Sequence, residues 1–141
     1  MIEKVELRAA KIPYVGLIAV HYWFVVKVDD ISQRWEIWQT KNLSQTCWGH
    51  LHLNLMGVYQ GVGNGESWLE TYWQGEQAQS LMTIIQSSPE KYPFNYLYRY
   101  YPGPNSNTYA QWVLHQGKIN YRLNWRGLGK RYRGGAEKVL W

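Results

Sequence analysis

Residues 102–114 have the sequence PGPNSNTYAQWVL, in which a turn is followed directly by a helical pattern. The two prolines and the glycine at 102–104 favour a turn, because proline fixes φ and glycine tolerates unusual φ values. Apolar side chains then recur with helical spacing at Tyr109, Trp112 and Val113, and Gly117 is a stop signal. The stretch therefore predicts a helix that starts beside the polar residues 105–108 and ends at Gly117.

The four small polar residues at 105–108 allow two interpretations. Asn105 or Ser106 can be an N-cap, since its side-chain oxygen accepts backbone N–H groups that the first turn leaves unpaired. Alternatively, Ser106 or Thr108 can present a hydroxyl nucleophile where the helix dipole and free N–H groups stabilise an anion. Composition favours the cap, although a cap explains only one or two of the four residues.

The rest of the chain predicts an antiparallel sheet and a second helix. Residues 14–26 are apolar on both alternating faces, which is typical of a central strand covered on both sides. Helical spacing occurs over residues 76–88, and Pro89 lies just beyond them. Alternation or aromatic content predicts further strands at 34–40, 50–56, 67–73 and 95–101. The fold class is therefore predicted to be α+β, an antiparallel sheet with two main helices.

Length and cysteine content restrict the class of protein. A chain of 141 residues fits a single domain over residues 1–141 that needs no disulfides to hold its core. Cys47 is the one cysteine in the sequence, so no intramolecular disulfide can form, and a cytoplasmic location is expected. No apolar run reaches the roughly 20 residues of a membrane span, and residues 1–10 lack the apolar block of a signal peptide.

Positive charge is concentrated at the C-terminal end. Residues 1–117 hold eight Lys/Arg and nine Asp/Glu, whereas residues 118–141 hold seven and one. The basic segment interleaves its charges with Tyr121, Trp125 and Tyr132, a mixture that suits single-stranded nucleic acid or a tail packed across the domain. Because the body is nearly neutral, nucleic acid is disfavoured, and an irregular, packed basic segment over 118–141 is expected.

Three histidines lie on predicted strands. His21 stands within the apolar run 14–26, where its ring nitrogens need partners: a backbone carbonyl in a structural role, or a hydroxyl if it is a general base. His50 and His52 share a strand face, but no third ligand follows at a recognisable spacing, so a solvent-facing strand and no metal are predicted. The glycines at 61–66 lack the setting of a dinucleotide loop, so no cofactor is predicted.

Several stretches resemble a known family. The sequence YRYYPGPNSNTYAQWVL (98–114) resembles the signature segment of a bacterial family of unknown function, in which a PGPNSNT run precedes a helix. AVHYWFVV (19–26), RWEIWQ (34–39) and LGKRY (128–132) are similar to other parts of that family. More distantly, the order of elements resembles circularly permuted papain-like proteins, among them lecithin retinol acyltransferase-like enzymes and relatives of cell-wall endopeptidases.

The papain-like resemblance implies a site and a reaction class. It aligns His21 with a catalytic histidine strand and Ser106 with a nucleophilic cysteine, and it implies that Asn105 or the Ser106 N–H holds an oxyanion, with Thr108 nearby. His50 or His52 would orient His21 only if their strand lies beside the strand of His21. The implied activity is that of a hydrolase or acyltransferase acting on an amide or ester, with a small-molecule, peptide or lipid-like acyl substrate. Serine in place of cysteine leaves open a catalytically silent binding module, which could contact an anionic partner or nucleic acid through its basic segment.

Overall fold

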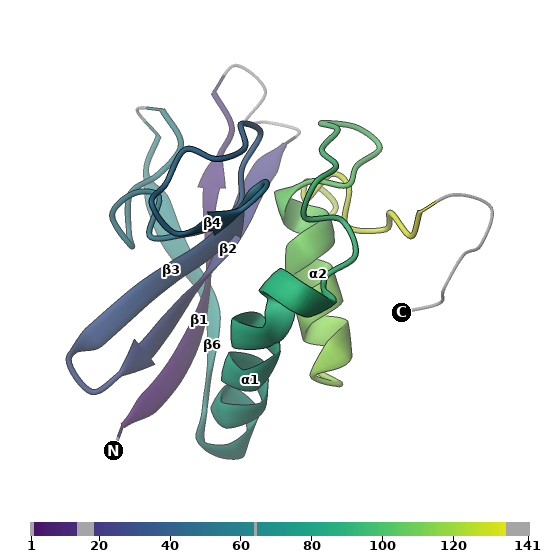
Figure 1. Cartoon of the computed structure of the whole chain (residues 1–141). Helices are drawn as coiled ribbons and strands as arrows, with labels where there is room; N and C mark the ends of the chain where they lie inside the picture. Colours follow the sequence, from purple (N-terminus) through teal and green to yellow (C-terminus); the bar gives the residue numbers. More distant parts are fainter. Residues whose placement is uncertain (1, 14–18, 64, 135–141) are drawn as a thin grey trace.

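The computed structural model describes residues 2–13, 19–63 and 65–134 (Figure 1). Its secondary structure is one six-stranded antiparallel sheet and two helices, which confirms the predicted α+β class. The strands lie in the order β4-β5-β3-β2-β1-β6. Their bounds are β1 Glu3–Lys11, β2 Val20–Val28, β3 Ile31–Ile37, β4 Cys47–Trp48, β5 Leu51–Leu53 and β6 Ser67–Gln74.

Both helices cover the same face of the sheet. Helix α1 (Gly75–Lys91) packs on β1 and β6, and helix α2 (Ser106–Gln116) packs on β2 and β3 (Figure 1). Alternate side chains of the central strands, such as Leu7 and Phe24, meet Leu81 and Val113 of the helices in one buried core. Neither helix, within the described residues, has the length and apolarity needed to cross a membrane.

The opposite face of the sheet carries a smaller cluster and the polar residues of the site. Trp23 and Val25 of β2 pack there against Val58 and Val62, which belong to the connection between β5 and β6. Alternation places His21 on this face of β2, since its neighbours Val20 and Tyr22 belong to the main core. The sheet thus has one face covered by helices and another partly covered by a loop.

β2 and β3 separate at one end, which leaves a gap in the sheet between its two faces. β3 pairs with β2 only along Phe24–Val28, so the first residues of β2 have no strand on that side. The first turn of α2 fills the gap, because the Asn107 side chain accepts from the Tyr22 N–H at 3.0 Å and donates to the Val20 carbonyl at 2.7 Å. Helix α2 therefore begins at the open edge beside His21.

The segment after α2, as far as residue 134, is irregular and packs back along that helix. Leu123 is buried in the core, and the Gln111 side chain bonds both the Tyr121 carbonyl and the Leu123 N–H. Tyr121 contacts Trp73 edge-on, but Trp125 is exposed, so the prediction that the aromatic rings pack holds for only part of the segment. The chain beyond residue 134 lies outside the described residues.

The structure differs from the sequence-based prediction at several elements. The prediction had no strand at β1, although Val5, Leu7 and Ala9 alternate with polar residues there. Helix α1 was predicted to end before Pro89 but continues through it. Proline has no N–H to donate to the Ile85 carbonyl, and that carbonyl accepts a hydrogen bond from the Ser88 hydroxyl instead. Predicted strands at 34–40 and 50–56 are shifted or shortened to β3 and β5, and part of the predicted strand 14–26 (residues 14–18) lies outside the described residues.

Residues 95–101 form no strand, contrary to prediction. The Asn95 side chain instead donates to carbonyls at the end of α1, and the Asn95 carbonyl accepts from the His50 N–H. Of the three tyrosines that are spaced by two residues, Tyr98 packs on His50, whereas Tyr96 and Tyr100 are exposed. Their spacing therefore does not mark the buried face of a strand.

Candidate functional site

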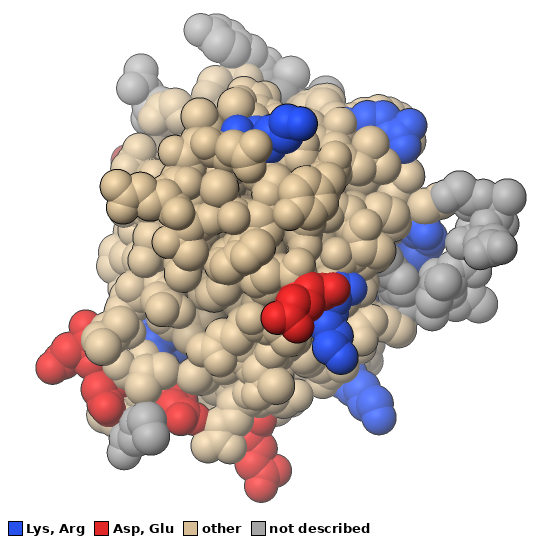
Figure 2. All heavy atoms as spheres, in the orientation of Figure 1, with Lys and Arg blue, Asp and Glu red and all other residues tan. Residues whose placement is uncertain are grey.

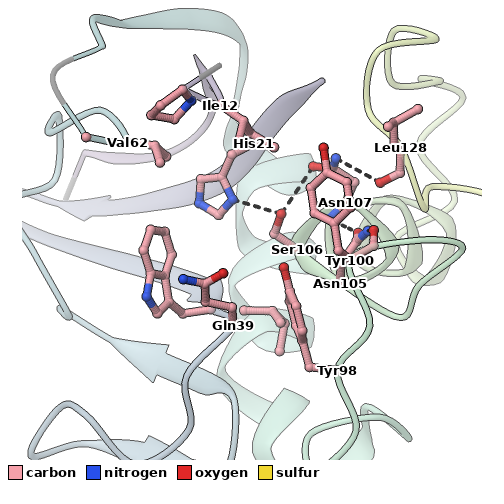
Figure 3. A pocket seen from close by; sticks show the side chains of 14 residues that line it. Ile12, His21, Gln39, Val62, Tyr98, Tyr100, Asn105, Ser106, Asn107 and Leu128 are labelled. Atoms are coloured by element: carbon pink, nitrogen blue, oxygen red, sulfur yellow. Dashed lines mark hydrogen bonds between the residues drawn. The ribbon is translucent and has the colours of Figure 1, made fainter. Parts of the chain in front are cut away.

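Ser106 and His21 meet at the open edge of the sheet. Ser106 is the first residue of α2, and its Oγ lies 2.8 Å from Nδ1 of His21 (Figure 3). Both residues are buried, with exposed fractions of 7% and 5%. The expected approach of the serine hydroxyl to a ring nitrogen of this histidine is therefore confirmed, even though His21 projects from the sheet face opposite the helices.

A buried glutamate holds the other side of the ring. Nε2 of His21 lies 2.8 Å from Oε2 of Glu36, a β3 residue that is fully buried. Burial raises the pKa of the Glu36 carboxyl, but the hydrogen bond from His21 and the charges of His21 and Arg34 outweigh it and leave the pKa below its ordinary value. Glu36 is therefore a carboxylate that accepts hydrogen bonds.

This carboxylate determines the state of the imidazole. Because ionised Glu36 can only accept, Nε2 of a neutral His21 carries the proton and donates it. Nδ1 then has a lone pair and accepts the Ser106 hydroxyl at 2.8 Å. A second acceptor for that hydroxyl, Oδ1 of Asn107, is more distant at 3.4 Å. Ser106, His21 and Glu36 thus form a hydrogen-bonded chain of hydroxyl, imidazole and carboxylate.

Arg34 completes the buried set on the same face of β3. Its Nε and Nη2 donate to the two oxygens of Glu36 at 2.7 and 2.9 Å. Its Nη1 donates to the carbonyls of Gly57 and Gln60, and its guanidinium lies 3.9 Å from the centre of the Trp23 ring. The bidentate pair is fully desolvated and hydrogen-bonded throughout, so the carboxylate is fixed in position.

The polar run 105–108 positions this site with all four side chains. Asn105 is the N-cap: its Oδ1 accepts the N–H groups of Asn107 and Thr108, and Thr108 accepts the Asn105 N–H in return. Its Nδ2 donates to the Tyr100 carbonyl, while the Thr108 hydroxyl donates to the Gly129 carbonyl. Asn105 and Thr108 are thus engaged in structural hydrogen bonds, and Ser106 is the member whose hydroxyl faces a base.

Gly129 shows how tightly the C-terminal segment closes over the cap. Its φ is +94°, and a Cβ there would lie within 2.6 Å of three Asn105 side-chain atoms. The neighbouring Leu128 carbonyl accepts from Asn107 Nδ2 at 3.0 Å. The basic segment is therefore part of the support for the first turn of α2.

A cavity of about 470 Å³ opens beside the Ser106–His21 pair (Figure 3). None of the side chains that line it within the described chain is Lys, Arg, Asp or Glu, and most are apolar or aromatic. They are Ile12, Pro13, His21, Ile37, Trp38, Gln39, Val62, Tyr98, Tyr100, Asn105, Ser106, Asn107 and Leu128, with Gly63. A cavity of this size and character suits a small, largely apolar group beside a few polar atoms.

His50 and His52 do not join the site. His52 is fully buried and lies 2.8 Å from the Ser44 hydroxyl and 3.0 Å from the Thr40 carbonyl, so the predicted solvent-facing histidine strand is wrong there. His50 lies 2.9 Å from the Trp38 carbonyl. No group of three or more His, Cys, Asp or Glu able to hold a metal occurs among the described residues.

Sequence reasoning missed Glu36, Arg34 and Asn107 as parts of the site. The available signal was a carboxylate at position 36 between the apolar residues Trp35 and Ile37, with an arginine two residues earlier on the same strand face. Such charges are buried only when they are paired, which points to a site or a structural ion pair.

Fold and site together define a class: an α+β protein in which a serine, a histidine and a glutamate form a hydrogen-bonded chain beside a cavity. The chain belongs to the family of proteins of unknown function DUF3750, which matches residues 2–132. No curated protein and no solved structure matches it.

Proposed function

We propose that the protein is a hydrolase or acyltransferase of permuted papain-like type that uses a serine nucleophile on an amide or ester. The observation that carries the proposal is the continuous chain from Ser106 Oγ to His21 to Glu36, with both hydrogen bonds at 2.8 Å, at the wall of a cavity. We place the reaction in the cytoplasm, since the lone Cys47 needs no oxidising compartment.

The first half of the reaction transfers the acyl group to the protein. Ser106 Oγ forms a bond to the substrate carbonyl carbon while its proton moves to Nδ1 of His21. The tetrahedral intermediate then breaks its bond to the leaving nitrogen or oxygen, which takes the proton from Nδ1. Glu36 stabilises the imidazolium that exists between these two steps.

The second half regenerates the serine. A water molecule, or the hydroxyl or amine of an acceptor, attacks the acyl-serine carbon and gives its proton to Nδ1. The bond from the carbon to Ser106 Oγ breaks, and Oγ recovers a proton from His21. Water as acceptor gives hydrolysis, and another nucleophile gives acyl transfer.

The N-terminus of α2 supports the developing negative charge. The Ser106 N–H opens the helix and has no hydrogen-bond partner within the part of the chain that the structure describes. This N–H points from the positive end of the helix dipole, so it can donate to an oxyanion. Asn105 is less suited, because its amide oxygen caps the helix and its nitrogen donates to the Tyr100 carbonyl.

A serine nucleophile depends on a general base more than the cysteine of the resembled enzymes does, because its hydroxyl stays protonated near a helix terminus. The Arg34-bound carboxylate of Glu36 prepares His21 as that base, since it fixes the imidazole with its lone pair toward Ser106.

A binding module without catalysis is the second candidate. It is favoured by the near-complete burial of Ser106 and His21, which narrows access for a carbonyl group.

A fluorophosphonate probe, which reacts with activated serines, tests the proposal. Labelling should map to Ser106 and disappear in Ser106→Ala and His21→Ala while far-UV circular dichroism is unchanged. Ser80→Ala, a serine change on the exposed side of α1, is the control and should label fully. Absence of labelling in the wild type would contradict catalysis and leave the binding module.

A further inference from the structure

Residues 91–134 carry one sign of charge only. They hold eight Lys/Arg and no Asp/Glu: Lys91, Arg99, Lys118, Arg122, Arg126, Lys130, Arg131 and Arg133. On the face of the molecule that Figure 2 shows, the acidic atoms lie in the middle and lower part, some of them beside basic atoms, whereas the basic atoms at the top have no acidic neighbours. The positive potential of such a segment attracts an anionic ligand.

A groove of about 380 Å³ lies within this segment, and we call it the Trp125 groove. Its lining includes the exposed aromatic rings of Tyr101 and Trp125, with exposed fractions of 68% and 65%. Arg131 is also exposed, and its side chain has no hydrogen-bond or ion-pair partner among the described residues. The remaining lining residues are Pro102, Gly127, Leu128, Gly129, Lys130 and Tyr132. Exposed aromatic rings next to a cation offer stacking to a planar ring and charge to a phosphate.

The groove adjoins the catalytic cavity. Leu128 lines both hollows, and its carbonyl accepts from Asn107, the residue after Ser106. The described lining of the cavity contains no Lys or Arg, so an anionic group has no counter-charge there. A substrate with a neutral end and an anionic end would therefore place the neutral end in the cavity and the anionic end in the groove.

We propose that the Trp125 groove binds the leaving-group half of the substrate, and that this half carries phosphate and a planar aromatic ring, as in an acyl ester or thioester of a nucleotide-bearing carrier. The inference rests on the proposed function, which it extends to a substrate class. Ser106 Oγ gains the acyl carbon, the bond from that carbon to the carrier oxygen or sulfur breaks, and the carrier takes the proton held by Nδ1 of His21.

Coenzyme A is a suitable probe because it carries phosphates and adenine and does not require the serine to react. Isothermal titration calorimetry should show binding to the wild type and to Ser106→Ala alike, and affinity should fall as salt rises. Trp125→Ala and Arg131→Ala should each weaken binding by about tenfold or more. The matched controls are Tyr96→Ala and Lys41→Ala. Tyr96→Ala removes a 73% exposed ring outside the groove, and Lys41→Ala removes an exposed lysine that does not line it.

The outcomes separate this inference from the proposed function. Pantetheine, which lacks the nucleotide, should bind at least tenfold more weakly than coenzyme A. Fluorophosphonate labelling of Ser106 without coenzyme A binding, or binding that survives both groove variants, would overturn the groove assignment alone. Coenzyme A binding without any labelling would overturn acyl transfer and with it the assignment of the ligand as an acyl donor. Tighter binding of a single-stranded oligonucleotide than of coenzyme A would also overturn the assignment of the ligand as an acyl donor.

Discussion

Replacement of Glu36 by glutamine tests the support of the histidine. The carboxylate accepts three short hydrogen bonds, from His21 at 2.8 Å and from Arg34 at 2.7 and 2.9 Å. A glutamine has one acceptor oxygen and one donor nitrogen, so in either orientation its NH₂ faces a donor of Arg34. It also leaves the buried guanidinium without a counter-charge, which costs on the order of 3–5 kcal/mol of unfolding free energy.

The same change should affect reactivity more than stability. If the glutamine NH₂ points at His21, Nε2 becomes an acceptor and the proton moves to Nδ1, which removes the base from Ser106. A wrong tautomer of this kind lowers the rate on the order of 10⁴-fold. Fluorophosphonate labelling rates and urea unfolding measure the two effects, with Glu90→Gln at an exposed position as the control.

A double variant separates the charge from the site. Glu36→Gln with Arg34→Met removes both buried charges, so it should recover most of the lost unfolding free energy. It should not recover labelling, because His21 still lacks its carboxylate. Labelling of Glu36→Gln at the wild-type rate would refute the argument that Glu36 orients the base.

Three further outcomes are expected. In Ser106→Cys, the helix terminus and His21 should lower the pKa of the new thiol, so that its alkylation at about pH 6 outpaces that of a free thiol; ordinary exposed-cysteine behaviour would reduce position 106 to a cap. The pKa of Glu36 in the folded protein lies below its usual 4.5, so the stabilisation that Glu36 provides is present above that pH and is lost as the pH falls through the folded pKa. The difference in unfolding free energy between wild type and Glu36→Gln, measured with urea, should therefore shrink as the pH falls below about 4.5, and a constant difference would contradict this. Deletion of residues 118–141 removes Leu123 from the core and the partners of Gln111, so the melting temperature should fall; an unchanged melting temperature would show that the segment does not support the fold.

Local patterns were enough to predict the helix at Ser106 and the buried strand at His21. The turn, the polar run and the helical spacing after residue 108 depend on neighbours in sequence, and α2 follows them closely. The meeting of Ser106 with His21 came from the papain-like resemblance, because a contact between residues 85 positions apart leaves no local pattern.

The opening of the sheet could not be predicted from these patterns. Alternation alone places His21 on the face away from the helices, which would separate it from Ser106. The contact exists because β3 stops pairing with β2 at Phe24 and Asn107 completes the free edge. Glu36 was missed for a related reason: it reaches His21 across that same gap, and its position within β3 gives no sign of its partner.

The state of the His21 ring tests the central claim most directly. Two-dimensional long-range ¹H–¹⁵N NMR of the protein at neutral pH, with His21→Gln to assign the signals, reports which ring nitrogen carries the proton. We predict a proton on Nε2, bonded to Glu36, and an unprotonated Nδ1 that accepts the Ser106 hydroxyl. A proton on Nδ1 would contradict the account, because Ser106 would then donate to Asn107 Oδ1 at 3.4 Å and would have no base.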